Sequence, residues 1–130
     1  MNSIDTATWL KKICKYRWVY LFVRRIRYTL QFFKRGFSDR QLWSLDVTIA
    51  EFILPRLQRF KEINSGLPFH KTEDRHCTEE EWREILNKMI FAMEYIKNLD
   101  QITSTKATDE YTRYQEGMTL FATYFIDLWD

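Results

Sequence analysis

Residues that interrupt a regular backbone are rare in this sequence: its 130 residues include three Gly and two Pro. Because Gly and Pro are the strongest helix breakers, their scarcity favours long helices over many short strands and turns. A chain of this length fits one domain, and a hydrophobic content of 45% is enough for a buried core. We therefore expect an all-α helical bundle, a single domain over residues 1–130 made of four helical segments.

The first expected segment is a long helix from about Thr6 to Arg35, ended by Gly36, which suits the left-handed position after a helix. Its apolar residues form two stripes, rotated by roughly 100° from each other on a helical wheel. One stripe consists of Trp9, Ile13, Tyr16 and Tyr20, and the other of Val19, Phe22, Val23, Ile26, Leu30 and Phe33. Either the helix breaks near Tyr16 to Trp18, or a continuous helix buries two faces against two partners.

The second expected segment starts at a capping box, in which Ser38 and Gln41 exchange hydrogen bonds at the helix start. The helix should then continue to about Ile63. Pro55 lies inside it, removes one backbone hydrogen bond and predicts a bend. The expected core face of this segment consists of Leu42, Ile49, Ile53, Leu57 and Phe60.

The third segment also has a capping box, formed by Thr78 and Glu81. Its core stripe shows the clearest helical spacing in the chain. The stripe consists of Trp82, Ile85, Leu86, Met89, Met93 and Ile96. A fourth helix is expected from about Thr108. Its expected buried residues are Tyr111, Tyr114, Met118, Phe121, Phe125 and Leu128.

Charge is divided unevenly along the chain, although the net charge is only +2. Residues 1–36 hold nine Lys or Arg against one acid, whereas residues 37–130 hold eleven against seventeen. We therefore expect a basic N-terminal helix over 1–36 and an acidic helical body over 37–130. Such a basic segment either pairs with the acidic remainder, in one chain or between copies, or binds an external anion.

Several basic residues of the first helix fall on one side, opposite its second apolar stripe. With one tyrosine, this candidate anion-binding or partner-binding face consists of Arg17, Arg24, Arg27, Tyr28, Lys34 and Arg35. Guanidinium groups bind phosphate and carboxylate in a bidentate way. The alternative is a solvated basic face that only balances the acidic body.

Aromatic residues that exceed the needs of the expected core indicate an interface. Trp9 and Tyr16 lie on the first stripe of the first helix, and Phe91 and Tyr95 lie opposite the core stripe of the third. We expect these four residues at a contact with a second copy or with another protein.

Catalytic and metal-binding motifs are poorly represented. The three glycines are isolated, which excludes a phosphate-binding loop, and no G-x-S-x-G turn is present. The stretch HKTEDRHC brings His70, His76 and Cys77 close in sequence, and these are zinc-competent residue types. Their spacing matches no common zinc motif, and a polar solvent-facing loop is the simpler interpretation. We predict no enzyme, no cofactor and no metal.

The two cysteines, Cys14 and Cys77, provide no disulfide framework, and the N-terminus lacks the apolar run of a signal peptide. The longest local apolar run, residues 18–23, is far shorter than the ~20 residues that cross a bilayer. These observations predict a cytoplasmic protein without a membrane span. A helix lying on a membrane surface has one apolar stripe and a polar opposite face. Because two stripes compete here and the core should take one, we rank an anionic partner ahead of a membrane.

Four stretches resemble, in order, segments of short uncharacterised proteins encoded by tailed bacteriophages: RGFSDRQLWSLD, FILPRLQRFKEI, TEEEWREILNKMI and EGMTLFATYFIDLWD. The resemblance covers roughly residues 35–130 and leaves the basic first helix mostly outside. It implies a phage origin and a role in the cytoplasm of an infected bacterial host. It assigns no catalytic or binding residue.

These observations predict a non-catalytic phage protein that acts by binding. It would be a protein-interaction or self-assembling module, a homo-oligomer or a partner of a host protein, with a basic face for an anionic partner. The alternative is a ligand-binding protein that sequesters a phosphorylated small molecule, such as a host defence nucleotide signal. A second alternative, nucleic-acid binding through the N-terminal helix, is weaker because the rest of the chain is acidic.

Overall fold

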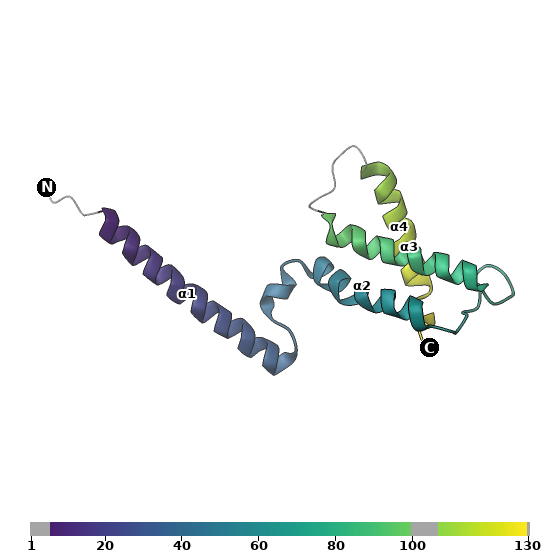
Figure 1. The fold of residues 1–130 in the computed structure, drawn as a ribbon, viewed down its shortest axis with the longest axis horizontal. Helices are drawn as coiled ribbons and strands as arrows, with labels where there is room; N and C mark the ends of the chain where they lie inside the picture. Colours follow the sequence, from purple (N-terminus) through teal and green to yellow (C-terminus); the bar gives the residue numbers. More distant parts are fainter. Residues whose placement is uncertain (1–5, 100–106, 130) are drawn as a thin grey trace. The chain divides into compact units, whose positions relative to one another are not determined.

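The computed structural model describes residues 6–99 and 107–129, with side chains over 15–99 and 108–129. The protein is all-α, as predicted, and these described residues contain no β-strand (Figure 1). The elements are α1 (Thr6–Arg35), η1 (Asp39–Leu42), α2 (Leu45–Ile63), α3 (Glu79–Lys97), α4 (Ala107–Thr123) and η3 (Phe125–Asp127), where η denotes a short 3-10 helix.

The chain divides into two compact units, Met1–Ser44 and Leu45–Asp130. The N-terminal unit holds α1 and η1, and the C-terminal unit holds α2, α3, α4 and η3. The residues of η1, which we had grouped with the acidic body, therefore belong with the basic helix.

The first helix is continuous: α1 runs for 30 residues without a break at 16–18. Both apolar stripes consequently lie on one helix. Gly36 has a φ of 80°, and its N–H donates to the Phe32 carbonyl at 2.7 Å, so α1 ends at a left-handed glycine as expected. Lys34 and Arg35 in its last turn complement the negative end of the helix dipole.

The expected start of the second helix is wrong. The Ser38 N–H donates to Gln41 Oε1 at 2.9 Å, as in a capping box, but the turn that follows is only the short helix η1. Contacts with α1 hold this turn: the Asp39 N–H donates to Gln31 Oε1 at 3.0 Å, and Gln31 Nε2 donates to Asp39 Oδ2 at 2.7 Å. The second long helix, α2, begins at Leu45.

Helix α2 contains Pro55 without ending there, as predicted, whereas a bend at this residue stays a prediction. Its expected core face needs correction. Leu42 and Ile49 are exposed, and the buried residues are Ala50, Leu54 and Leu57. Since Leu42 lies in η1, outside α2, the predicted stripe loses its first member.

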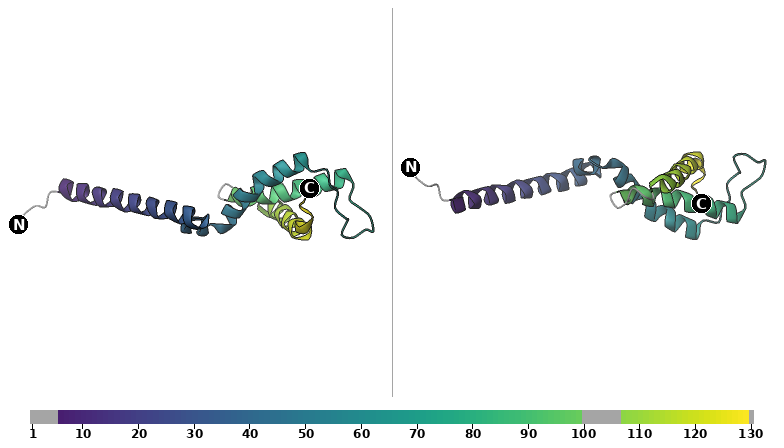
Figure 2. Two further views of the ribbon diagram at one scale, coloured as in Figure 1. Left: turned by 90° about the horizontal axis from the view of Figure 1, so that it is seen from below. Right: turned by 90° about the horizontal axis from the view of Figure 1, so that it is seen from above.

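Helix α3 starts as predicted. The Glu81 N–H donates to Thr78 Oγ1 at 3.2 Å, and the Thr78 N–H donates to Glu81 Oε2 at 2.8 Å. In the C-terminal unit, α3 packs against both α2 and α4, and Figure 2 shows this arrangement from two sides. The centre of the core therefore lies on α3. Its buried residues are Trp82, Leu86, Met89, Ala92 and Met93.

Helix α4 approaches α3 closely at Gly117. A Cβ atom at this position would overlap the Lys88 carbonyl oxygen and lie 2.8 Å from Ala92 Cβ. Two residues expected in the core, Tyr111 and Phe125, are exposed instead. Phe125 lies in η3, beyond the end of α4, so helical spacing no longer applies to it. The Tyr111 ring contacts a second tyrosine of α4, and that second ring is the one that stacks against α3.

Candidate functional site

The second apolar stripe of α1 is exposed, contrary to our expectation that a bundle buries it. The exposed fraction within this stripe ranges from 44% for Ile26 to 82% for Phe33. The physical reason lies in the turn after Gly36. It brings η1, the other element of the N-terminal unit, to the opposite, polar side of α1, where it contacts Gln31 and Arg35. Within the described part of that unit, no element covers the apolar side.

One member of the predicted basic face, Arg35, is already bound within the chain. Its guanidinium forms an ion pair with Asp39, donates through Nε to the Phe37 carbonyl at 3.2 Å and stacks on the Phe37 ring. Hydrogen bonds from Arg35, and secondly from Gln31, lower the pKa of Asp39 below its usual value. Arg35 therefore anchors η1 to α1.

Two further members, Arg24 and Tyr28, also belong to this α1–η1 contact. The Arg24 guanidinium lies 5.5 Å from the centre of the Tyr28 ring and 5.3 Å from that of the Trp43 ring. Such cation–π contacts hold the arginine by its planar face. Arg24 and Tyr28 are half-buried as a result.

The remaining members of the predicted face, Arg17, Arg27 and Lys34, are exposed. Among the residues with described side chains, none of these three forms an ion pair with a carboxylate. The sequence of α1 explains this shortage, since it holds nine Lys or Arg and no Asp or Glu. The basic face is thus divided: part of it binds η1, and part of it stays available.

A shallow hollow of about 870 Å³ lies between α1 and η1. It combines cations with aromatic rings. Sequence reasoning did not identify it, because Arg25 and Arg40 line the same hollow only as a result of the turn after Gly36. Its lining residues are Leu21, Arg24, Arg25, Tyr28, Thr29, Phe32, Phe33, Ser38 and Arg40.

The four predicted interface aromatics fall in different places. Tyr16 is 71% exposed on α1, and the side chain of Trp9 lies outside the described residues. Phe91 is covered by the Arg113 guanidinium, 3.9 Å from its ring centre. Tyr95 stacks on an α4 tyrosine, with 4.9 Å between ring centres. Phe91 and Tyr95 therefore contribute to the contact between α3 and α4, and Tyr16 alone of the described three is largely exposed.

The histidine and cysteine side chains of the loop before α3 are used locally. His70 Nδ1 accepts from the Glu73 N–H at 3.1 Å, and the His76 ring meets the Phe69 ring edge-on. Cys77 is buried, and burial raises the pKa of its thiol. Across residues 6–99 and 107–129, no three His, Cys, Asp or Glu side chains are arranged to hold a metal ion.

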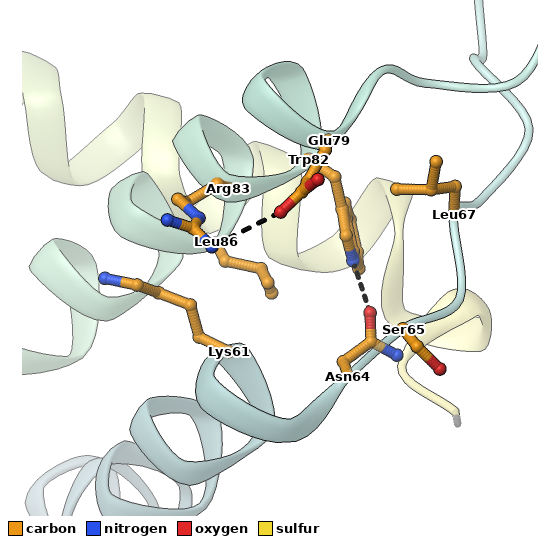
Figure 3. Close-up of a pocket in the computed structure, with 8 residues that line it drawn as sticks. All are labelled: Lys61, Asn64, Ser65, Leu67, Glu79, Trp82, Arg83 and Leu86. Atoms are coloured by element: carbon orange, nitrogen blue, oxygen red, sulfur yellow. Dashed lines mark hydrogen bonds and ion pairs between the residues drawn. The ribbon is translucent and has the colours of Figure 1, made fainter.

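The C-terminal unit has a pocket of about 300 Å³ between α2, the following loop and α3 (Figure 3). Its polar groups are already bonded. The Trp82 indole N–H donates to Asn64 Oδ1 at 3.0 Å, Arg83 lies 3.5 Å from a Glu79 oxygen, and Lys61 donates to a neighbouring asparagine. The pocket therefore offers few free groups for a ligand, and α1 carries the stronger candidate site.

Among the described residues, no helix has the length and apolar content to span a bilayer. Comparisons with protein-family models, curated proteins and solved structures give no match to this chain.

Proposed function

We propose that the protein is a non-catalytic binding protein and that α1 is its recognition element. The carrying observation is that α1 exposes an apolar stripe next to cations that lack a carboxylate partner among the described side chains. Large exposed apolar surfaces mark interaction sites, and unpaired like charges beside them select a partner of opposite charge. The phage origin and the setting in an infected bacterium, which the sequence resemblance implies, belong to this proposal.

The composition of the core supports this assignment. Every buried hydrophobic residue of the described part belongs to the C-terminal unit, from Ala50 to Tyr124. Burial of a large apolar side chain contributes about 1.5–3 kcal/mol, so this unit has its own source of stability. Among its described side chains, residues 15–35, α1 has none that is buried, which leaves its apolar stripe available for a partner.

The direct test places a photoactivatable amino acid at Phe22, which is exposed on α1, in the full chain expressed in bacterial cells. The matched control carries the same amino acid at Ile126, an exposed apolar residue of η3 in the C-terminal unit. We expect several-fold more cross-linked product from position 22. Equal yields from both positions would remove α1 as the recognition element.

A second candidate function, binding of a phosphorylated small molecule, is favoured by the hollow between α1 and η1. Arg24, Arg25 and Arg40 line it together with Tyr28 and Phe32, so guanidinium groups for phosphate and rings for a base lie side by side. A nucleotide at 100 times its Kd should stabilise the N-terminal unit by about 2.7 kcal/mol and slow hydrogen exchange of the α1 amides. A nucleotide panel that leaves the exchange of the α1 amides equally unchanged in the wild type and in Arg25→Glu would dismiss this candidate.

A further inference from the structure

The exposed apolar surface of α1 is wide and nearly uninterrupted. Most of it lies between Arg25 and Arg27 on a helical wheel, an arc of about 200°, and Tyr20, Leu21 and Phe32 are exposed just beyond these two arginines. We call this surface the apolar arc. It consists of Tyr16, Trp18, Val19, Phe22, Val23, Ile26, Leu30 and Phe33, and all eight side chains are exposed.

The polar groups inside the arc are few and are compatible with an apolar medium. Thr29 lies among the apolar residues, and its hydroxyl donates to the Arg25 carbonyl at 2.9 Å, so its hydrogen-bonding group is satisfied within the helix. Lys15 and Lys34 also fall within the arc, near its N-terminal and C-terminal ends along the helix axis, and their long stems allow the ammonium groups to reach water.

Cations border the arc on both sides. Arg25 lies at one edge, Arg27 and Lys34 lie at the other, and all three are exposed. The polar side of α1 binds η1 through Gln31 and Arg35. The turn therefore occupies the polar side and leaves the apolar arc, with its flanking cations, uncovered within the N-terminal unit.

We propose that α1 lies in the plane of an anionic phospholipid bilayer surface, with the apolar arc at the boundary between head groups and acyl chains; this inference rests on the proposed function and names its partner. Surface-lying helices combine an apolar face rich in Trp, Phe and Leu with Lys and Arg on the polar face. Trp and Tyr favour the interfacial depth, and cations near the surface are attracted by anionic lipids. The second apolar stripe, which we expected the core to bury, is exposed and is therefore free to face a membrane.

A second copy of the chain fits this surface less well. Within the arc, Tyr16, Val19, Val23, Ile26, Leu30 and Phe33 follow the alternating three- and four-residue spacing of a coiled coil. The positions that flank such a seam, however, hold Arg27 and Lys34, and α1 has no acid to pair with them. In an antiparallel pair these cations would face the same cations of the other copy, and in a parallel pair they would face Phe22 and Thr29, so neither arrangement gives them a carboxylate partner.

An acidic helix of another protein would neutralise those cations but would cover only part of the arc. The seam between two helices is narrow, whereas a bilayer surface covers an arc of about 200° over its whole width. The exposed Trp18 and Phe22 lie on the part of the arc near Arg25, outside the coiled-coil seam, and a bilayer would cover them too.

The experiment is co-sedimentation of the full chain with vesicles of phosphatidylcholine containing 30% phosphatidylglycerol, or of phosphatidylcholine alone. We expect at least tenfold stronger binding to the anionic vesicles, weakened by salt. The double variant Phe22→Glu and Leu30→Glu should lose at least tenfold in binding to them. Both side chains are exposed, so the variant should keep the circular dichroism and unfolding curve of the C-terminal unit.

The matched control carries the same change at two exposed apolar residues of the C-terminal unit, Ile63→Glu and Ile126→Glu, and should bind anionic vesicles like the wild type. Equal binding to both vesicle types, or equal binding by the arc variant and the wild type, would overturn the membrane inference. So would a dimer in light scattering that the arc variant abolishes, without vesicle binding. If position 22 then cross-links to a protein, α1 remains the recognition element and only the membrane inference fails. If position 22 gives no cross-link either, both the recognition role of α1 and the membrane inference fail.

Discussion

Helices α1 and α3 carry comparable apolar stripes, but the stripe of α3 is buried and that of α1 is exposed. On α3, Leu86 is 2% exposed because α2 and α4 supply apolar residues on both sides of it. On α1, Leu30 is 63% exposed, and the neighbouring η1 contacts the polar side of the helix. The difference shows that helical periodicity identifies an apolar face without identifying what covers it.

Charge distinguishes the two helices more clearly than hydrophobicity does. Helix α3 has three glutamates in its first turn and forms ion pairs to its own cations and to a glutamate of α4. Helix α1 holds cations alone. A helix whose charges are balanced within its own unit suits an internal position, whereas a helix with unbalanced charge suits an external partner of opposite sign.

The largest expected effect comes from the same substitution in the two helices. Leu86→Ala should lower the free energy of unfolding by about 2–5 kcal/mol, because it leaves a cavity in the core. Leu30→Ala should change it by no more than about 0.5 kcal/mol, because the side chain is exposed. Urea denaturation followed by circular dichroism measures both, and equal losses would contradict the contrast between the helices.

The close contact of α3 with α4 predicts the next effect. Gly117→Ala should cost about 1–3 kcal/mol because the added Cβ meets the Lys88 backbone, although Ala is the better helix former by about 1 kcal/mol. Gln115→Ala, an exposed position of the same helix, serves as the control and should be nearly neutral. A more stable Gly117→Ala protein would show that the two helices pack less closely than described.

The start of α3 predicts a smaller loss. Thr78→Ala removes the hydroxyl that accepts the Glu81 N–H and should lower the free energy of unfolding by about 1 kcal/mol. Thr119→Ala replaces a threonine inside α4 and should be neutral or slightly stabilising, because Ala is the better helix former. Differential scanning calorimetry of both variants checks the difference, and an unchanged Tm for Thr78→Ala would contradict the role of the cap.

The smallest effect concerns pH. Hydrogen bonds from Arg75, and secondly from the Thr78 backbone, lower the pKa of Glu81 from 4.5 to about 2. A lowered pKa in the folded state stabilises the fold above the unfolded value and loses this contribution as pH falls through the folded value. The wild type should therefore exceed Glu81→Gln in stability at pH 7, with the gap closing between about pH 4.5 and pH 2.

The ion pair in the N-terminal unit provides the control for this pH dependence. Arg35 lowers the pKa of Asp39 in a similar way, but Asp39 lies outside the unit that holds the core. Asp39→Asn should accordingly leave the unfolding of the C-terminal unit unchanged at every pH. Chemical denaturation at pH 7, 4 and 3 measures the stability of both variants against the wild type. A stability difference between the wild type and Glu81→Gln that does not change with pH would contradict the lowered pKa of Glu81.

Local signals in the sequence were sufficient to predict several features of the fold. Gly36 marks the end of α1, and Thr78 with Glu81 marks the start of α3, because each forms hydrogen bonds within a few residues. The box at Ser38 misled us, because Gln31, eight residues from Asp39, binds that residue and holds the turn as η1. Such a contact between elements leaves no periodic pattern in the sequence.

The candidate site was predictable only in part, for the same reason. The basic face of α1 follows from residue spacing, but the capture of Arg24 by Trp43 and of Arg35 by Asp39 depends on the direction of the turn after Gly36. The exposure of the apolar arc likewise depends on which side η1 covers. The absence of acids from α1 was the sequence signal for an external partner.

Hydrogen exchange of the full chain, without vesicles or ligand, tests the central contrast most directly. Amides in the core helix α3 should exchange only by global unfolding of the C-terminal unit, whereas those of α1 should open locally. Amides around Ile26 should exchange at least about 100-fold faster than those around Met89. Equal protection of the two helices in the free chain would mean that the apolar arc is already covered, and it would contradict α1 as an open recognition surface.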